Sequence, residues 1–281
     1  MNFLNILYAV LILGALGLVL GGLLAFASRV FAVDRDDRYD KVTELLPGAN
    51  CGGCGYAGCA NYAAALVDGE AALSACPVSN ESAMGSIAKI LGIELTKNER
   101  LQALVRCNGG TRTKRKFDYV GISDCAAANR VAGGDLECSY GCLGFGSCAK
   151  ACAFDAISIK NGVAVVDGER CTGCLQCVSA CPRGIIVPVP YTADVNVICS
   201  NHDSGAALRG MCEIGCIGCK ICVKACKYGA ITVEDNLARI DYSKCTGCGE
   251  CALKCPRGLI INSKLMEPPV AVSENVSYTN N

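Results

Sequence analysis

Residues 148–186 read CAKACAFDAISIKNGVAVVDGERCTGCLQCVSACPRGII, and residues 222–260 read CVKACKYGAITVEDNLARIDYSKCTGCGECALKCPRGLI. The two stretches align without a gap when Cys148 is set against Cys222, and every cysteine in one matches a cysteine in the other. Agreement over this length indicates that one structural module has been duplicated in the chain. The shared cysteines and their spacing therefore decide the fold and the chemistry of both copies.

The number of cysteines narrows the class of protein. The chain has 24 cysteines among 281 residues, a density typical of a disulfide scaffold or of metal-cluster ligation. Disulfide scaffolds are usually short, whereas this chain is long and most of its cysteines fall in tight, repeated runs. Cluster ligation in a reducing cytoplasm fits better. Lys+Arg and Asp+Glu balance at 26 each, so the net charge gives no support for a nucleic-acid partner.

The copy nearer the C-terminus has two runs with the spacing C-x2-C-x2-C-x3-C, which begin at Cys216 and Cys245. In two-cluster ferredoxins the first three cysteines of such a run bind one [4Fe–4S] cluster, and the fourth binds the other cluster. One predicted ligand set is therefore Cys216, Cys219, Cys222 and Cys255. The second predicted set is Cys226, Cys245, Cys248 and Cys251. A zinc ion would be crowded by such triple runs.

The other copy has a looser first run, with the spacing C-x3-C-x5-C-x3-C from Cys138 to Cys152. The same rule predicts one ligand set of Cys138, Cys142, Cys148 and Cys181. It predicts another of Cys152, Cys171, Cys174 and Cys177. Between the runs, Asn161-Gly162 is a strong hairpin turn signal between candidate strands at 156–160 and 163–167, with counterparts at 231–234 and 237–241. Both copies are thus expected to have the α+β ferredoxin fold, with a short helix after each run.

A further cysteine group nearer the N-terminus predicts one more [4Fe–4S] cluster. Its ligands would be Cys51, Cys54, Cys59 and Cys76, with the spacing C-x2-C-x4-C-x16-C-P. The surrounding glycines allow a tight loop around a cluster. Zinc is an open alternative for this motif alone. The G-x-G-x-x-G match at 53–58 is rejected as a dinucleotide site, since no hydrophobic strand precedes it.

These sets use 20 cysteines for five clusters and leave Cys107, Cys125, Cys199 and Cys212. We expect the four to be buried thiols that act as small hydrophobic residues. A sixth cluster or a Cys–Cys bond are the alternatives. The basic run of Arg112 and 114–116 is expected to be a solvated loop, with docking of an acidic electron carrier as the alternative.

The N-terminal segment has no charged residue from Phe3 to Ser28, which exceeds the ~20 apolar residues that span a bilayer. No basic residue precedes the apolar stretch. Four basic residues follow it, namely Arg29, Arg35, Arg38 and Lys41. This asymmetry predicts a single-pass anchor in the cell membrane with the rest of the chain in the cytoplasm. A cleaved signal peptide would need a basic n-region and a shorter apolar core.

The expected organisation is α+β with an N-terminal transmembrane helix and three cysteine-rich modules. We call these the first cluster module (33–93), the middle ferredoxin module (134–190) and the C-terminal ferredoxin module (191–266). The remaining expected parts are the anchor at 1–28, a linking segment at 94–133 and a disordered tail at 267–281.

The order of a membrane helix, a C-x2-C-x4-C-x16-C-P module and two-cluster ferredoxin modules resembles the B subunit of the Rnf complex, in its long form with two ferredoxin modules. The resemblance implies a subunit of a membrane-bound ferredoxin:NAD oxidoreductase that is coupled to Na⁺ or H⁺ translocation. The subunit would accept electrons from reduced ferredoxin and pass them to membrane partners. Flavins and the NAD site would belong to other subunits, so no catalytic side chain is expected in this chain.

Two other functions remain open from the residues. The chain could feed electrons to another membrane oxidoreductase, of the hydrogenase or dehydrogenase type. It could instead be a non-redox metal-binding scaffold.

Overall fold

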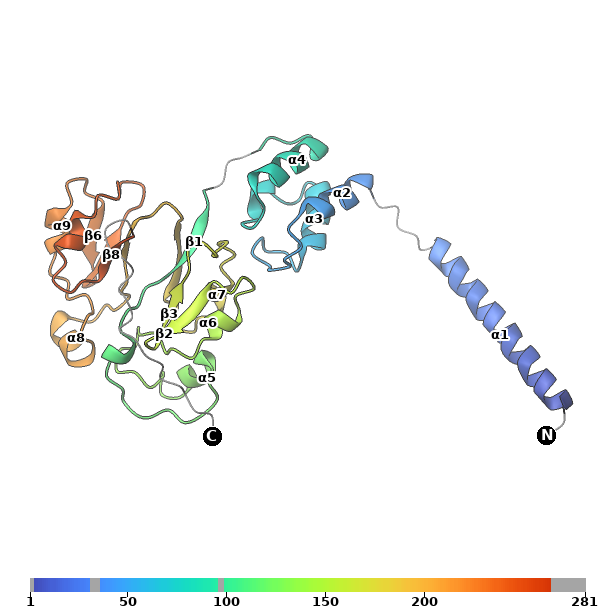
Figure 1. Cartoon of the computed structure of the whole chain (residues 1–281), viewed down its shortest axis with the longest axis horizontal. Helices are drawn as coiled ribbons and strands as arrows, with labels where there is room; N and C mark the ends of the chain where they lie inside the picture. The colour runs from blue at the N-terminus through green and yellow to red at the C-terminus, as the bar shows by residue number, and fades with distance from the viewer. Residues whose placement is uncertain (1–2, 31–35, 96–98, 264–281) are drawn as a thin grey trace. The chain divides into compact units, whose positions relative to one another are not determined.

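The N-terminal unit of the chain (Met1–Lys41) contains a long apolar helix. In the computed structural model, which describes residues 3–30, 36–95 and 99–263, helix α1 runs from Phe3 to Val30 (Figure 1). The part from Val10 to Val30 is long and apolar enough to cross a membrane. Of the predictions above, the tail at 267–281 and the position of Arg35 lie outside the described residues.

The second unit (Val42–Asn281) begins with the first cluster module. The described elements of this module are α2 (Asp37–Leu45), which begins in the N-terminal unit, α3 (Cys59–Val67), the 3₁₀ turn η1 (Leu73–Ala75) and α4 (Glu81–Leu91). Val42, Tyr62, Leu66 and Ile87 are buried and form the apolar side of these short elements. The Asn80 side chain caps α4 by accepting a hydrogen bond from the Ala83 N–H at 2.7 Å.

The middle ferredoxin module is built from two antiparallel strand pairs. Strand β2 (Ile157–Lys160) pairs with β3 (Val163–Val166), and both turn residues between them have positive φ, 49° at Asn161 and 73° at Gly162. The predicted hairpin is therefore confirmed, since a two-residue turn of this type needs positive φ at both positions. Strand β1 (Leu101–Val105) pairs with β4 (Ile186–Pro190), so the predicted boundary at residue 134 leaves out a strand of this module.

The short helices of the middle module lie inside the cysteine runs, at the third cysteine of each run, and not after the runs as predicted. These are α6 (Ser147–Lys150) and α7 (Gln176–Ala180). The segment between β1 and α6 adds the 3₁₀ turn η2 (Gly110–Arg112) and helix α5 (Cys125–Arg130). Residues 94–133 thus contribute a strand and a helix rather than only a link.

The C-terminal ferredoxin module repeats this arrangement. Its strand pairs are β5 (Val195–Val197) with β8 (Ile260–Asn262) and β6 (Ile231–Glu234) with β7 (Leu237–Ile240). Its helices are α8 (Gly205–Met211), α9 (Ile221–Ala225) and α10 (Glu250–Leu253). Strands β6 and β7 begin at the positions that the sequence alignment matches to the starts of β2 and β3, which confirms the repeat and, with it, the α+β fold class.

The two ferredoxin modules differ by an insertion before the first helix. Cys107 follows β1 and its sulfur contacts the backbone of Cys142, 35 residues later. Cys199 follows β5 and its sulfur contacts the backbone of Cys216, 17 residues later. The middle module therefore has the longer connection, and α5 lies within it.

Cysteines form a large part of both ferredoxin cores. The C-terminal core contains Cys199, Cys216, Cys222 and Cys251 among buried valines, isoleucines and leucines. The core of the middle module contains Cys142, Cys148, Cys171 and Cys177. Such small cores, rich in thiols, indicate that groups bound to the cysteines contribute to the stability of each module.

Candidate iron–sulfur sites

Each cysteine run of the ferredoxin modules is shaped by two residues with left-handed backbone conformation. In the C-terminal module Gly218 and Lys220 have φ of 64° and 58°, on either side of Cys219. The same pair of positive φ values recurs at 144 and 146, 173 and 175, and 247 and 249. The second residue of each pair precedes α6, α7, α9 or α10, and no side chain caps these helices. The first N–H groups of each helix are therefore left for sulfur acceptors.

In the C-terminal module the second predicted set surrounds one cavity. The cavity has an empty volume of about 340 Å³ and is lined by Cys226, Cys245, Cys248 and Cys251. Burial raises the pKa of the Cys251 thiol to about 11, and the thiolates of Cys226 and Cys245 add to this. The Ala230 N–H donates to Cys226 Sγ at 3.3 Å. Cys226, the last cysteine of the first run, thus lies with the first three cysteines of the second run.

The other set of this module is also brought together. Burial raises the pKa of the Cys222 thiol to about 11, and nearby thiolates at Cys216, Cys219 and Cys255 raise it further. Cys255 is the last cysteine of the other run, just after α10, so this set crosses between the runs as well. The assignment of clusters to these two sets stays a prediction, and the arrangement of the thiols agrees with it.

One set of the middle module follows the same pattern. Burial raises the pKa of the Cys177 thiol to about 11, with further increases from Cys171, Cys174 and Cys152. Backbone N–H groups donate to two of these sulfurs, from Ala103 to Cys171 Sγ at 3.5 Å and from Ala156 to Cys152 Sγ at 3.4 Å. The donor at residue 103 comes from β1, which explains why this strand belongs to the module.

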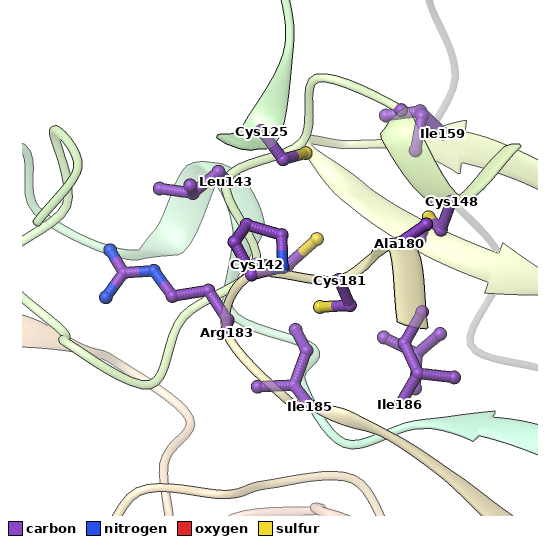
Figure 2. A pocket seen from close by; sticks show the side chains of 14 residues that line it. Cys125, Cys142, Leu143, Cys148, Ile159, Ala180, Cys181, Arg183, Ile185 and Ile186 are labelled. Atoms are coloured by element: carbon purple, nitrogen blue, oxygen red, sulfur yellow. The ribbon is translucent and has the colours of Figure 1, made fainter. Parts of the chain in front are cut away.

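The remaining set of the middle module differs from the prediction in one residue. A cavity of about 360 Å³ is lined by Cys125, Cys142, Cys148 and Cys181, whose side chains surround it in Figure 2. The pKa of Cys148 is raised to about 11 by burial first and then by the Cys125 and Cys181 thiolates. Cys138, which the spacing assigned to this set, does not line this cavity. Cys125, which the sequence reasoning left without a role, does.

Phe145 explains why Cys125 lines this cavity in place of Cys138. When the alignment of the two copies is continued toward the N-terminus without a gap, this position corresponds to Cys219, and the left-handed turn around it is kept. The Phe145 ring packs edge-on against Tyr119 with ring centroids 5.3 Å apart, as part of a small core with Ala128 and Leu136. Phe145 thus anchors the inserted segment, which supplies Cys125 as the fourth thiol. The match to Cys219 was the signal that could have revealed this.

Cys138 lies in a third cavity together with the other three cysteines that the predicted sets left over. This cavity has an empty volume of about 320 Å³ and includes Cys107, Cys138, Cys199 and Cys212 in its lining. Cys138, Cys199 and Cys212 are buried, and Cys107 is half-buried. The expectation that the leftover cysteines are buried thiols therefore holds for Cys125, Cys199 and Cys212 but not for Cys107. Cys107, Cys199 and Cys212 also share one cavity and are not isolated from one another.

The first cluster module holds its cysteines through local hydrogen bonds. Asn50 Oδ1 accepts a hydrogen bond from the Cys59 N–H at 2.8 Å, and Ser79 Oγ donates to Cys76 Sγ at 3.4 Å. The buried Tyr62 hydroxyl bonds the carbonyls of Ala72 and Leu73, both at 2.9 Å. Its pKa is raised by burial, with Cys76 and Cys54 contributing. These contacts return the chain from α3 to the fourth cysteine, with Cys51, Cys54, Cys59 and Cys76 all half-buried.

The residues of these sites fit [4Fe–4S] clusters. All 24 cysteines are free thiols, and soft thiolate ligands suit iron–sulfur clusters. Within the described ranges, no three Cys, His, Asp or Glu side chains converge as a site for one metal ion, and three cavities have four cysteines in their lining. Burial raises the pKa of several of these thiols, so a bound positive centre is needed to keep them as thiolates.

The basic run at Arg112 and 114–116 has a partly structural role. Arg115 Nη1 forms an ion pair with the carboxylate of Asp135, whose side chain is completely buried. Arg112 donates to the Asn108 carbonyl. Two of the four basic side chains therefore hold the inserted segment, which weakens the alternative of a docking patch at this run.

Three protein-family models match the chain at the cysteine-rich modules. Residues 46–78 match a family described as "Putative Fe-S cluster", which covers the four cysteines of the first cluster module. Residues 164–187 match a 4Fe-4S binding domain, and residues 215–259 match a 4Fe-4S dicluster domain. Iron–sulfur binding domains are therefore present in each of the three modules.

Similar proteins extend over most of the chain. It is 48% identical over 257 residues to the B subunit of the Na(+)-translocating ferredoxin:NAD(+) oxidoreductase complex of Acetobacterium woodii, which covers 91% of this chain and 77% of that protein. It is 42% identical to the B subunit of the ion-translocating oxidoreductase complex of Methanosarcina acetivorans, over 90% of this chain and 96% of the relative. The B subunit of the proton-translocating ferredoxin:NAD(+) oxidoreductase complex of Clostridium ljungdahlii is 40% identical, over 91% and 92%. With identity at this level over nine-tenths of its length, the chain belongs to the family of B subunits of Rnf-type ion-translocating oxidoreductase complexes and is an electron-transfer subunit.

Proposed function

We propose that this chain takes electrons from reduced ferredoxin and passes them through cysteine-bound [4Fe–4S] clusters to flavin-carrying and membrane subunits of its complex. The observation that carries the proposal is the grouping of thiols in the ferredoxin modules. Two sets of four line a cavity each, and the last cysteine of one run lies with the first three of the other. Such clusters accept and release one electron at a time. The names of the Acetobacterium and Clostridium relatives include ferredoxin and NAD(+), which supports the choice of donor and final acceptor.

Five clusters follow from the predicted sets once Cys125 takes the place of Cys138. Four of the sets are those predicted above, and the fifth is Cys125, Cys142, Cys148 and Cys181. The change keeps four thiols around each cluster. It also moves one ligand into the insertion that distinguishes the middle module from its copy.

The modules lie close enough to form an electron path within the second unit. A Cβ atom added at Gly53 would lie 3.0 Å from the Cα atom of Cys174, so the loop of the first cluster module touches a ligand of the middle module. Burial raises the pKa of the Cys174 thiol, and the Cys51 thiolate adds to this. On the other side, Leu104 of β1 packs against the core of the C-terminal module. The order of contacts is therefore C-terminal, middle, first.

Electron input is proposed at the C-terminal ferredoxin module. Of the 24 cysteines, Cys219 and Cys248 are exposed, and both belong to this module. Exposed lysines at 224 and 227 lie on and just after α9, close in sequence to Cys222 and Cys226. Positive charges around an exposed ligand loop would attract an acidic carrier such as ferredoxin.

Helix α1 is proposed to cross the cell membrane once, with the cysteine-rich unit in the cytoplasm. The helix is apolar over its length and has Arg29 in its last turn, and further basic residues follow at 38 and 41. A single helix offers no path for an ion. Translocation of Na⁺ or H⁺ is therefore assigned to the partner subunits.

The proposal is tested with the full chain in detergent, prepared anaerobically. Reduced ferredoxin should bleach the cluster absorbance in a stopped-flow experiment without NAD, whereas NADH alone should act slowly, since a hydride donor needs a flavin to deliver single electrons. Rapid reduction by NADH with none by ferredoxin would overturn the proposal.

The docking site is tested by charge reversal. A Lys224→Glu/Lys227→Glu chain should be reduced by ferredoxin about tenfold more slowly at low salt, and the difference should shrink as salt is added. The matched control is Lys89→Glu/Lys160→Glu, which reverses two exposed lysines on α4 and β2 and should leave the rate unchanged. Equal rates for both double variants would place the input elsewhere.

A further inference from the structure

We propose that Cys107, Cys138, Cys199 and Cys212 hold a sixth [4Fe–4S] cluster between the two ferredoxin modules. The proposal rests on the proposed function only in that it adds a cluster to the same electron path. The four thiols line one cavity of about 320 Å³. Two come from the middle module and two from the C-terminal module.

The four cysteines occupy equivalent places in the two modules. Cys107 follows β1 and Cys199 follows β5, and each of these strands pairs with the last strand of its own module. Cys138 and Cys212 have the same separation along the chain as Cys148 and Cys222, so they are matched by the duplication. The cavity is therefore lined by two corresponding pairs of thiols that face each other across the contact between the modules.

Each of the four sulfur atoms accepts a hydrogen bond. The Cys142 N–H donates to Cys107 Sγ at 3.3 Å, and the Cys216 N–H donates to Cys199 Sγ at 3.5 Å. Asn201 Nδ2 donates to Cys138 Sγ at 3.2 Å. Thr113 Oγ1 donates to Cys212 Sγ at 3.8 Å. Hydrogen bonds to sulfur are the contacts by which proteins stabilise cluster thiolates and adjust their potentials.

Two arginines hold the chain segments that carry Cys138 and Cys212. Arg183 donates to the carbonyl of Ser139, and Arg257 donates to the carbonyl of Cys212 at 3.1 Å. The two arginines are also matched by the duplication, and each follows the Cys-Pro of the last run of its module. Burial lowers the pKa of Arg183, and the nearby thiolates of Cys138, Cys181 and Cys107 raise it again. The positive guanidinium of Arg183 therefore lies near a site that would bind an anionic cluster.

The lining of the cavity by four thiols favours a cluster over the alternatives. Like the cavities that are lined by four-cysteine sets of the ferredoxin modules, it has four cysteines in its lining. A zinc ion would draw four sulfurs to about 2.3 Å from one point. A Cys–Cys bond would use the thiols in pairs, and all four are free.

The sixth site is tested by iron and sulfide analysis of the anaerobically prepared full chain. The unchanged protein should bind about 24 iron and 24 sulfide, four per cluster, and Cys107→Ala/Cys212→Ala, with one ligand removed from each module, should bind about 20. Cys138→Ala/Cys142→Ala should lose about eight iron atoms, because the two cysteines would belong to two different clusters. If both bound the same cluster, the variant would lose only about four. About 20 iron in both the unchanged protein and the Cys107/Cys212 variant, or one zinc per chain, would overturn the proposal.

A second variant tests the site without removing a ligand. Asn201→Asp keeps the oxygen that accepts the Asp203 N–H but replaces the donor to Cys138 with a negative charge. One cluster signal should shift to a lower potential in an anaerobic redox titration followed by electron paramagnetic resonance, with the other signals unmoved. Unshifted potentials throughout would count against the cluster. Because neither test involves ferredoxin, failure of the sixth site is distinguishable from failure of the electron-input role.

Discussion

The backbone N–H of Cys125 donates a hydrogen bond to Ser147 Oγ over 2.8 Å. The same hydroxyl donates to Asp124 Oδ2 at 2.6 Å, and Lys150 Nζ donates to the carbonyl of Ser123 at 3.0 Å. Helix α6 carries Ser147, Cys148 and Lys150, so it holds the inserted segment directly beside its own cysteine. The insertion and the cluster loop are thereby fixed as one structural piece.

Replacement of Ser147 by alanine should loosen the hold on Cys125. The change removes both hydroxyl hydrogen bonds, at a cost of about 1 kcal/mol each, and leaves the Cys125 N–H without its acceptor. One cluster should then be lost faster than the others when an iron chelator is added under anaerobic conditions. The Ser158→Ala variant is the control, since Ser158 is exposed on β2. Identical chelation curves for the two variants would contradict the role of Ser147.

The exchange of Cys138 for Cys125 also shows how far the sequence alone could be used. In the C-terminal module all eight predicted ligands lie in the two tight runs, so their spacing reports the geometry directly. In the middle module Phe145 occupies the position that matches the predicted ligand Cys219. Cys125 comes from a segment that folds back through contacts such as Ser147–Asp124 and Tyr119–Phe145. Spacing along the chain carries no information on such a return.

Strand β1 was missed for a related reason. Leu101–Val105 lies in the segment interpreted as a link, and its partner strand begins only at Ile186, beyond both cysteine runs of the module. A short apolar stretch fits a strand only if a partner is known. The hairpin at Asn161-Gly162 was predictable because its partners are adjacent and its turn residues demand positive φ.

The exchange of ligands between runs predicts the result of removing Cys255. Its thiol lies with Cys216, Cys219 and Cys222, although it follows Cys251 closely in sequence. A Cys219→Ala/Cys255→Ala chain should therefore lose about four iron atoms, and a Cys248→Ala/Cys255→Ala chain about eight. The two chains differ only in which exposed cysteine is replaced. The reverse ranking in an anaerobic iron assay would refute the cross-ligation.

Removal of the Arg115 side chain should destabilise the inserted segment. The Asp135 side chain is completely buried, and its Oδ1 atom has no hydrogen-bond partner, so Arg115 is the cation that offsets the desolvation of this carboxylate. Arg115 is partly exposed, which reduces the expected cost to about 2 kcal/mol. The midpoint for thermal loss of cluster absorbance should fall by roughly 5 °C.

Two variants separate charge pairing from loss of side-chain packing at this site. Lys114→Ala removes a neighbouring exposed lysine and should leave the midpoint unchanged. Arg115→Ala/Asp135→Asn removes the buried charge together with its partner, and should recover much of the lost stability. A double variant no more stable than Arg115→Ala would show that the ion pair is not the cause.

The close contact between Gly53 and Cys174 predicts that electrons pass between the first cluster module and the middle ferredoxin module at this point. An added Cβ at Gly53 would meet the Cα and carbonyl oxygen of Cys174, both at 3.0 Å, so only glycine permits this approach without movement of the backbone. Gly53→Val should push the loop of the first cluster module away from Cys174. The clusters of the two modules would then be farther apart, while all four ligands of each remain.

The chain with Gly53→Val should therefore bind a full complement of iron yet pass electrons more slowly into the first cluster module. Rapid-freeze electron paramagnetic resonance after mixing with reduced ferredoxin would follow the order in which the cluster signals appear. Gly85→Ala is the matched control, because a Cβ there meets nothing within 4 Å and alanine suits the interior of α4. The late signal should be delayed in the first variant and unchanged in the second. An undelayed signal in Gly53→Val would mean that electrons reach the first cluster module by a route other than Cys174.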